Sequence, residues 1–564
     1  MIDTSFSRSP FLWTAMFVVL AAGRILSTYG ITSQAFDEPC HVAAGIELLS
    51  RGTYTLDPVH PPLARWAIGI PLYLAGVRYP QTGPAAVSDN YNVVGNSILY
   101  DSGHHTRDLA LARLSVLPFF FFAACVVFLW ACHEFGDFAA VMAVGLFTTL
   151  PIVLAFSGIA YTDMIAASTQ AAFLFVFVIW LQRRTTRTTI LLGIAAGLAL
   201  SAKFTSLIFL PAAAGGILIT KWILAHNGGP PPRLTATARQ SAIAGLIAVA
   251  LLWGGYRFAY GHVQESMQLS VASMPSFQNF PAPIRGMARK LVLSDPMVPA
   301  PALIKGLATV WVLNHQAPNS YLFGKIKRGG WWYFFLAGIA VKSPLPFLLL
   351  TMVGFIALWP LARSRQWTAL APAVSAAAIL VVTMPVKYNA GVRHVMVVFP
   401  LLSIMAGQGC SFLWRMRQPW HRVGKIVLLG LLTWQVVSTY RARQDFIAYF
   451  NELGGRDPSR ILVMGCDLDC GQDVIRLSKE LRAEKAPQVT LALWTSADMS
   501  RSDLPPFAVA QPGKPVSGWL AVSVRALRVG HVFHDQYPEN AFEWLNQYTP
   551  VKHVGKTILL YHLP

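Results

Sequence analysis

Charged residues are scarce: Asp, Glu, Lys and Arg make up only 13% of the 564 residues, whereas hydrophobic residues make up 54%. Soluble domains usually carry about 25% charged residues, so this composition, with a mean hydropathy of +0.48, excludes an ordinary soluble protein. Acidic residues are fewer than basic ones, 26 against 45. The composition indicates a polytopic membrane protein.

Cysteine is also rare, and the six cysteines show no CxxC pair and no Cys/His spacing that favours a zinc site. Cys466 and Cys470 share a segment that we expect outside the cytoplasm, where a disulfide is permitted. The sequence does not decide whether the two cysteines form that bond. No small-residue cleavage site follows the first apolar run, 11–29. We therefore expect a retained span there and not a signal peptide.

Long apolar runs recur through the first 441 residues. A helix needs about 20 apolar residues to cross the bilayer core, and eleven runs approach this length. The two short runs at 188–202 and 204–220 are nearly continuous, which favours a tight hairpin or tilted or broken helices. The predicted spans are 11–30, 112–132, 138–156, 164–182, 188–202, 204–220, 240–259, 345–361, 367–386, 395–413 and 426–441.

Basic residues cluster in the short gaps between these runs, as the positive-inside bias predicts for cytoplasmic loops. A cytoplasmic amino terminus places all of the clusters inside, and the opposite register places all of them outside. No single basic face with interleaved aromatics occurs, so we expect no nucleic-acid partner despite the net charge of +19. The clusters are Arg183, Arg184 and Arg187; Lys221, Arg233 and Arg239; Arg363 and Arg365; and Arg415, Arg417, Arg422 and Lys425.

This register leaves two large outer loops, 31–110 and 260–344, within a membrane domain of residues 1–441. The stretch 63–77 in the first loop is amphipathic enough to lie in the interface. After residue 441 the composition becomes that of a soluble domain, with strands predicted at 461–465 and 489–494 and a helix at 473–485 between them. We expect residues 442–564 to form a small extracytoplasmic α/β domain.

An acidic pair, Asp37-Glu38, lies just beyond the first apolar run, and Asp163 begins a later span. Carboxylates at the edge of a bilayer are costly unless water, a cation or chemistry compensates them, so they mark a candidate active site. A carboxylate can take the proton of an attacking hydroxyl or amine, while cations stabilise a departing phosphate. The basic and titratable residues expected at the same face are Arg113, Lys203, Lys342, Lys387, Arg393, His41, His60 and His394.

Each of these residues also has a plain structural interpretation. The Asp37-Glu38 pair fits a solvated loop, Asp163 fits a helix N-cap, and Lys203 fits a lysine that snorkels at a hairpin tip. His41 and His60, taken singly, fit structural histidines. The arrival of polar groups from five separate segments at one membrane face favours a shared site.

The order of these segments resembles the GT-C superfamily of polyprenyl-phosphate-sugar glycosyltransferases, in its bacterial-type branch of protein O-mannosyltransferases and the lipid A aminoarabinose transferase. The matching pieces run from the first loop to the tail. They are Phe36-Asp37-Glu38-Pro39-Cys40-His41, Asp57-Pro58-Val59-His60-Pro61-Pro62-Leu63, Ala112-Arg113-Leu114-Ser115, Ser157-Gly158 through Thr162-Asp163, Gly197-Leu198-Ala199-Leu200-Ser201-Ala202-Lys203-Phe204, Lys342-Ser343-Pro344-Leu345-Pro346, Arg393-His394-Val395, Tyr449-Phe450-Asn451-Glu452-Leu453 and 467–473.

The resemblance implies a GT-C-like membrane protein of about 11 helices that transfers a sugar, with inversion, from a polyprenyl-phosphate donor at the extracytoplasmic face of a bacterial plasma membrane. Asp37 is similar to the acidic residue that activates the acceptor, with Glu38 beside it, and Asp163 to a second acidic position. Lys203, Arg113 and Arg393 resemble cations around the lipid phosphate, and His60, Lys342 and His394 are further expected substrate contacts.

Two features leave the resemblance incomplete. Cys470 stands where bacterial relatives often show an aromatic residue, and no lumenal repeat domain is present, so the acceptor (lipid, glycan or protein) and the hexosyl or pentosyl group stay open. No cofactor is certain. Members differ over a divalent metal; the sequence predicts no metal site, and Glu38 with His41 is the pair that could hold one.

A non-enzymatic transporter or flippase for a lipid-linked or anionic substrate is the alternative from another class. It would explain many spans and charges within the membrane. Such transporters commonly show paired broken helices in two related halves, and the sequence has no such symmetry. The large outer loops and the soluble tail also favour the enzyme.

Overall fold

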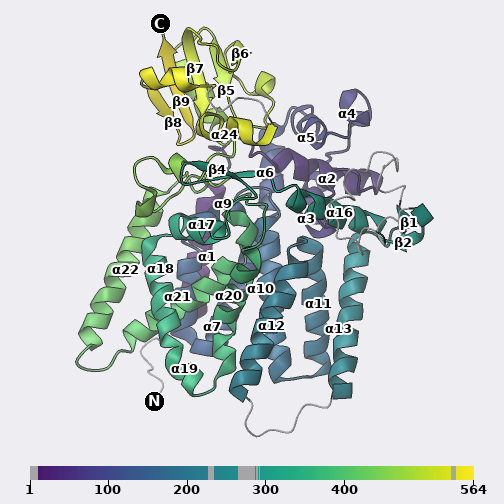
Figure 1. Cartoon of the computed structure of the whole chain (residues 1–564), viewed down its shortest axis with the longest axis vertical. Coiled ribbons are helices and arrows are strands. Elements are labelled where there is room, and N and C mark those ends of the chain that lie inside the picture. The colour runs from purple at the N-terminus through teal and green to yellow at the C-terminus, as the bar shows by residue number, and fades with distance from the viewer. Residues whose placement is uncertain (1–9, 226–233, 264–285, 287–289, 291–292, 535–540) are drawn as a thin grey trace.

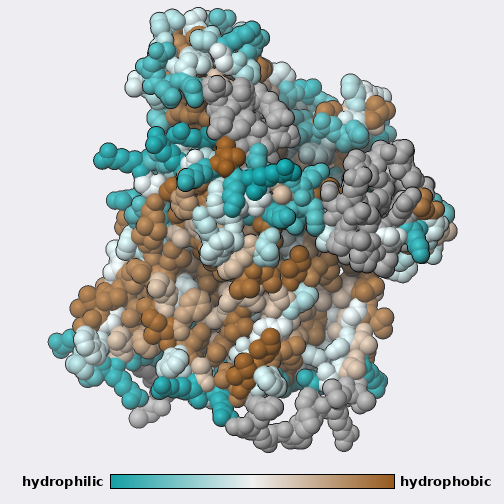
Figure 2. Space-filling model, in the orientation of Figure 1, coloured by the Kyte–Doolittle hydropathy of each residue, from teal (hydrophilic) through white to brown (hydrophobic). Residues whose placement is uncertain are grey.

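The structure is a computed structural model that describes residues 10–225, 234–263, 286, 290, 293–534 and 541–564. Three layers follow one another along the long axis (Figure 1): a bundle of long helices, a layer of short helices and loops, and a small sheet at the far end. The face of the bundle seen in Figure 2 is mostly hydrophobic, with hydrophilic residues gathered at its two ends. This distribution is that of an integral membrane protein.

Each of the eleven predicted spans coincides with helical structure in the described residues. Among the described residues, six helices are long and apolar enough to cross a membrane, and the pair α8 and α9, bent by 67°, has the length and composition of a broken span or a re-entrant loop. Four shorter apolar helices coincide with the other predicted spans. The helices are α1 (Pro10–Leu26), α7 (Leu117–Phe135), α8 (Asp137–Phe147), α9 (Pro151–Ser157), α10 (Asp163–Gln182), α11 (Thr186–Ala202), α12 (Ser206–Ala225), α13 (Leu234–Gly255), α18 (Leu345–Ala357), α19 (Trp359–Arg363), α20 (Trp367–Thr383), α21 (Val398–Trp414) and α22 (His421–Arg441).

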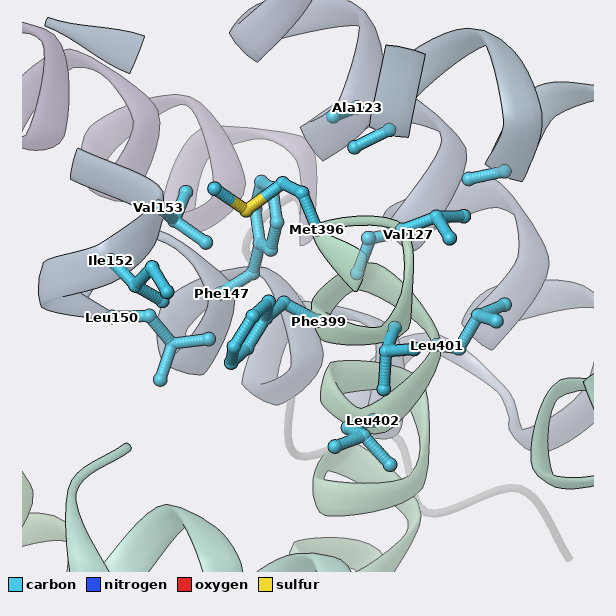
Figure 3. Packing of buried hydrophobic residues seen from close by; sticks show 14 of the residues in the cluster. Ala123, Val127, Phe147, Leu150, Ile152, Val153, Met396, Phe399, Leu401 and Leu402 are labelled. Carbon is cyan, nitrogen blue, oxygen red and sulfur yellow. The ribbon is translucent and has the colours of Figure 1, made fainter. Parts of the chain in front are cut away.

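Small residues set the closest helix contacts. A Cβ added at Gly354 of α18 would meet the Met405 carbonyl oxygen at 1.9 Å, and one at Gly409 of α21 would meet that of Leu350 at 2.1 Å. Lipid tails give helices no hydrophobic reason to associate, so close approach at small residues supplies the packing energy instead. Bulky side chains fill the core between α21, α7 and α8, among them Met396, Phe399 and Leu401, which face Val127 and Phe147 in Figure 3.

The segments at 188–202 and 204–220 do not form a packed hairpin. Residues 203–205 join α11 to α12, but α11 packs mainly against α13 and α10, while α12 packs mainly against α20. Lys203 has an extended backbone at the junction. Its side chain reaches Asp163 at the start of α10, as described below. The two helices diverge from this junction instead of pairing.

The first outer loop is mostly helical and caps the outer ends of α10 to α13 (Figure 1). The stretch predicted to be amphipathic at 63–77 is α3. Part of the second outer loop, 264–285, 287–289 and 291–292, lies outside the described residues. The described elements are α2 (Glu38–Arg51), α3 (Pro62–Leu74), α4 (Pro84–Val87), α5 (Tyr91–Tyr100), α6 (His105–Leu114), β1 (Tyr260–His262), β2 (Met297–Pro299), α16 (Pro301–His315), β3 (Asn319–Leu322), β4 (Lys325–Arg328), α17 (Phe334–Lys342) and η4 (Val392–Val395).

The tail ends in a five-stranded mixed sheet of order β6-β5-β7-β9-β8, in which β5 pairs parallel with β6 and β7, and β9 pairs antiparallel with β7 and β8. The predicted helix at 473–485 and strand at 489–494 are present. The elements are η5 (Glu452–Gly454), η6 (Pro458–Arg460), α23 (Val474–Ala483), β5 (Val489–Ala492), η7 (Met499–Arg501), β6 (Phe507–Val509), β7 (Gly518–Ser523), α24 (Val524–His534), η8 (Glu543–Gln547), β8 (Lys552–Val554) and β9 (Ile558–Leu563).

The strand predicted at 461–465 is wrong. Residues 461–465 are irregular, and their buried members Leu462, Val463 and Met464 pack against the membrane bundle and not into the sheet. Gly465 has a left-handed backbone (φ +56°), and a Cβ there would lie 1.6 Å from the Ala390 carbonyl oxygen. Only glycine permits this approach. Residues 446–470 share the core of the spans, whereas the sheet has clusters of its own, so we propose that the separate tail unit begins near Val474 and not at 442.

Cys466 and Cys470 form a disulfide, which settles the bond that the sequence left open. The loop that it closes pairs with the chain just before Asp37. Phe36 N–H donates to the Cys470 carbonyl at 2.9 Å, and Ser33 N–H donates to that of Gln472 at 3.0 Å. The tail therefore holds the start of the first outer loop directly.

Candidate active site

Four charged residues from four segments meet at the outer end of the bundle. Nη1 of Arg393 lies 2.9 Å from Oδ2 of Asp37 and 3.8 Å from Oδ2 of Asp163. Nζ of Lys203 donates to Oδ1 of Asp163 at 2.5 Å. We call Asp37, Asp163, Lys203 and Arg393 the central cluster. It combines two carboxylates with two cations in a largely buried setting.

Local backbone geometry explains how these side chains reach one another. Asp37 is the N-cap residue of α2, but its side chain caps no backbone N–H and pairs with Arg393 instead. Asp163 is the first residue of α10, and Thr162 holds the N-cap position, so the predicted N-cap role of Asp163 is wrong. The Lys203 side chain is only 9% exposed, so it does not snorkel toward water.

Two histidines border the central cluster. His394 follows Arg393 in η4, and burial, together with the nearby charges of Lys203 and Arg393, lowers its pKa well below the ordinary value. Burial lowers the pKa of His60 as well, against the carboxylate of Asp57. Both imidazoles are therefore neutral at physiological pH and leave the positive charge to lysine and arginine.

The central cluster contains polar atoms with no protein partner. Oδ2 of Asp163, Nε of Arg393 and Nε2 of His394 are buried and accept or donate no hydrogen bond among the described residues. Leaving a buried polar atom unsatisfied costs about 1–3 kcal/mol, and native structures contain few such atoms. Three of them together indicate a place for a polar ligand or water.

Glu38 and Arg113, also predicted as site residues, form a separate pair. Nε and Nη2 of Arg113 each donate to Glu38 at 2.8 Å, and both side chains are 0% exposed. The backbone N–H groups of Ala35 and Ala160 also donate to Glu38. With two guanidinium and two amide donors, the Glu38 carboxylate joins the segment before α2 to the segment before α10.

Lys342 lies against the tail and not in the central cluster. Its ammonium donates to the carbonyl oxygens of Ile447, at 2.7 Å, and Asp467. Burial lowers the pKa of Lys342 and raises that of the neighbouring Asp467 carboxyl. That carboxyl accepts the Val392 N–H at 3.0 Å, so Lys342 and Asp467 fix the chain that carries Arg393.

An aromatic layer separates Asp37 from the sheet. Phe36 stacks on Trp494 with ring centroids 4.8 Å apart, and the Arg525 guanidinium lies 4.0 Å from the centroid of the Trp494 ring. Beneath it, the Tyr161 hydroxyl accepts the Asp37 N–H at 2.8 Å, and its ring faces Arg393. The tail thus packs against the chain beside Asp37.

Asp469, beneath Arg525, gives a pH dependence that can be measured. Burial raises the pKa of its carboxyl from 3.8 to about 6, against the stabilising Gly471 N–H. The folded state therefore holds a proton that the unfolded state has lost, and stability falls as the pH rises from about 4 to 6. Asparagine does not titrate, so we expect Asp469→Asn to avoid this loss of stability, which amounts to at most about 3 kcal/mol. The variant should then melt at a higher temperature than the wild type at pH 7 but not at pH 4.

Several site residues were not singled out from the sequence. Asp57 lies 3.3 Å from Nδ1 of His41 and 2.8 Å from Nδ1 of His60. Burial would raise the pKa of Asp57, but the two histidines hold it below its ordinary value. The spacing Asp57-Pro58-Val59-His60 was a usable signal for this pair. Nothing in the sequence indicated Tyr161, Arg525 or Trp494, because their roles depend on how the tail docks.

The pair that could hold a metal, Glu38 and His41, does not form a set of ligands in the structure. The Glu38 oxygens accept hydrogen bonds from Arg113, Ala35 and Ala160, whereas His41 faces Asp57. The chemically suitable group among the described residues is instead Cys40, His41 and Asp57.

No protein-family model and no curated protein matches the sequence. Among solved structures, the chain is similar to ArnT from Cupriavidus metallidurans bound to undecaprenyl phosphate, with 12% identity, a TM-score of 0.47 and coverage of 97% of this chain and 98% of that one. The apo state of ArnT matches with 13% identity, a TM-score of 0.48 and 97% coverage of each chain. The archaeal oligosaccharyltransferase AglB from Archaeoglobus fulgidus, in complex with an inhibitory peptide and a dolichol-phosphate, matches with 13% identity and a TM-score of 0.48 over 87% of this chain and 65% of that one.

With 12–13% identity and TM-scores of 0.47–0.48, these likenesses carry no conclusion about the family, the site or the mechanism of this chain.

Proposed function

We propose that this chain is an inverting glycosyltransferase that moves a sugar from a polyprenyl-phosphate donor to an acceptor at the extracytoplasmic face of the membrane. The observation that carries the proposal is the central cluster, in which two carboxylates and two cations share a buried site with unsatisfied polar atoms. A site of this kind suits a reaction in which one group loses a proton and another leaves as an anion.

Asp37 is the best placed base. Its side chain is 30% exposed, against 1% for Asp163, so an acceptor can reach it. In the proposed step the acceptor hydroxyl or amine gives its proton to Asp37 and attacks the anomeric carbon. The new bond forms as the bond from that carbon to the phosphate oxygen breaks, with its electron pair passing to the phosphate. Attack opposite the leaving group inverts the anomeric centre.

Arg393 and Lys203 are the groups that would hold the departing phosphate. Each cation already forms an ion pair with a carboxylate, so each is oriented before substrate arrives. Charges that are oriented in advance in a site with little water strongly stabilise an anion that forms during the reaction. The open Nε of Arg393 leaves the guanidinium a further donor for a phosphate oxygen. Asp163 contacts both cations and orients them, so we assign it a positioning role.

Glu38 and Arg113 act, in this proposal, by holding the loop and not by contacting substrate. Their pair joins the chain before Asp37 to the chain before Asp163, and both side chains are fully buried. The distance between Asp37, the proposed base, and Asp163, the proposed positioning residue, therefore depends on this pair. Lys342 is proposed to act in the same indirect way on Arg393.

The proposed membrane side follows from the basic clusters. Among the described residues, the connections from α10 to α11, from α19 to α20 and from α21 to α22 carry three of these clusters and lie at the end of the bundle opposite to the sheet (Figure 1). Basic loops stay in the cytoplasm, so the central cluster and the tail would face outward and the amino terminus inward. We propose a bacterial plasma membrane as the location.

Turnover of a panel of labelled prenyl-phosphate sugars by the purified full-length protein tests the function. We expect the wild-type chain in native lipid to release free prenyl phosphate from one donor and to form a product of inverted configuration. A transporter or flippase would leave every donor chemically intact. If no donor of the panel is consumed with lipid, glycan and protein acceptors present, the proposal fails.

Lys203→Met should weaken donor use much more than folding. Loss of a charge-assisted hydrogen bond costs about 1.5–3 kcal/mol, which is roughly 10–100-fold in donor affinity, while Asp163 keeps Arg393 as a partner. Lys203→Arg should retain part of the activity. The matched control is Lys387→Met on an exposed lysine of the same face. Parallel losses of melting temperature and donor affinity would instead assign Lys203 a structural role.

A further inference from the structure

A second buried cluster lies beside the central cluster, where the first turn of α2 meets the loop before α3. Sγ of Cys40, a ring nitrogen of His41 and a carboxylate oxygen of Asp57 all lie within 4.8 Å of one another. The three residues are 7%, 4% and 4% exposed. Nδ1 of His60 lies 2.8 and 3.0 Å from the two oxygens of Asp57.

The loop that presents Asp57 is held from two sides. Glu47 accepts hydrogen bonds from Thr53, Thr55 and Leu56. Arg65 donates to the carbonyl oxygens of Leu56, at 2.7 Å, and Asp57, at 2.6 Å. Glu47 and Arg65 are themselves buried. A buried charged pair at this position fixes the loop without help from the Cys40 cluster.

This support keeps Asp57 in an unusual conformation. Asp57 has φ +50°, the left-handed region that a residue with a side chain adopts at a cost of roughly 1–2 kcal/mol. Strain of this kind persists where the surroundings impose it and is concentrated at ligand sites. Here it turns the carboxylate toward Cys40 and His41.

We propose that Cys40, His41 and Asp57 bind a divalent cation of the zinc class, with His60 orienting the Asp57 carboxylate from outside the ligand set. A thiolate, an imidazole and a carboxylate together suit zinc, which takes sulfur, nitrogen and oxygen ligands. Magnesium and calcium prefer oxygen ligands alone. A hydrogen-bonded partner behind a metal ligand is the usual arrangement in such sites.

Charge balance also favours a doubly charged cation. A Cys40 thiolate and an Asp57 carboxylate carry two negative charges, and neutral His41 carries none, so the bound ion leaves the buried site neutral. On binding, the Cys40 thiol loses its proton to solvent, and the sulfur electron pair goes to the metal. No oxidation or reduction is involved.

The cation would join the start of α2 to the loop at Asp57. His41 also contacts the Tyr161 ring, with centroids 5.5 Å apart, and the Tyr161 hydroxyl holds the backbone of Asp37. The bound ion would therefore fix the backbone that carries Asp37. Metal binding does not require the proposed sugar transfer, and each can fail without the other.

Metal content and cobalt spectra of the purified full-length protein, prepared with a tag that contains no histidine, test the site. We expect about one zinc ion per chain in the wild type and in Cys125→Ser, a control with the same change at an exposed cysteine. Cys40→Ser and His41→Gln should lose the zinc. Titration with Co²⁺ should give a sulfur-to-cobalt charge-transfer band in the wild type and in Cys125→Ser only.

A wild-type protein that retains no zinc and shows no such band with Co²⁺ would overturn the proposal. Retention of wild-type zinc by a folded Cys40→Ser protein would also overturn it, because another site would then hold the metal. If the two loss variants do not fold, the wild-type cobalt spectrum decides alone, since a hydrogen-bonded cluster of Cys40, His41 and Asp57 produces no charge-transfer band.

Discussion

Asp37→Asn should lower kcat for sugar transfer by roughly 10²–10⁴-fold, the usual contribution of a general base, with little change in donor affinity. Asparagine keeps an oxygen for Arg393, which lies 2.9 Å from the Asp37 carboxylate, but it cannot take a proton. The measurement is steady-state transfer with the donor that the wild-type protein consumes, together with binding of the matching prenyl phosphate.

The control for Asp37→Asn is Asp89→Asn, which makes the same chemical change at an exposed position of the same outer loop. This variant should retain wild-type kcat. If Asp37→Asn keeps more than about a tenth of wild-type kcat, the base lies elsewhere. A lost donor affinity with unchanged kcat would show instead that Asp37 serves to orient Arg393.

Arg113→Met should destabilise the protein by about 3–5 kcal/mol, the usual effect of removing one partner of a buried ion pair. The change leaves the Glu38 carboxylate buried, with the Ala35 and Ala160 N–H groups as its remaining donors. We expect a low yield of folded protein and a lowered melting temperature in detergent. Any folded fraction should bind donor with nearly wild-type affinity.

Two comparisons make this outcome specific. Arg482→Met, which removes a half-exposed arginine paired with the exposed Asp503, should have an effect below about 1 kcal/mol. Adding Glu38→Gln to Arg113→Met should recover part of the stability, because the unpaired charge is gone. A stable Arg113→Met protein with weakened donor binding would return Arg113 to the lipid-phosphate role that the family resemblance implies.

The sequence predicted the membrane helices well because long apolar runs have few alternatives in a bilayer. It also placed Asp37, Asp163, Lys203, Arg393, His60 and His394 at one face, and the structure brings these residues together. These residues stand at or beside the same ends of the predicted spans, so patterns along the chain are sufficient to group them.

The sequence did not separate the residues that line the central cluster from those one layer behind it. Glu38 follows Asp37 directly, but the first turn of α2 directs one carboxylate to Arg393 and the next to Arg113. Lys342 stands at the outer end of a helix, as Lys203 does, but it meets the tail. Such differences depend on helix rotation and on contacts between remote segments.

The errors in the tail have the same origin. Residues 461–465 have the apolar composition of a buried strand, but they are buried by the membrane bundle and not by a sheet. The close approach of Gly465 to Ala390 and the Cys466–Cys470 disulfide bend the chain there. The sequence predicted correctly that this segment is buried. The local pattern did not show that the membrane bundle, and not a sheet, would bury it.

An experimental structure of the full-length protein with a bound prenyl phosphate tests most directly whether the central cluster is the reactive site. We expect the phosphate to lie between Lys203 and Arg393, with the Asp37 carboxylate facing the side from which an acceptor would approach. A phosphate bound at the basic end of the bundle, or at the outer face but away from both cations, would contradict the assignment.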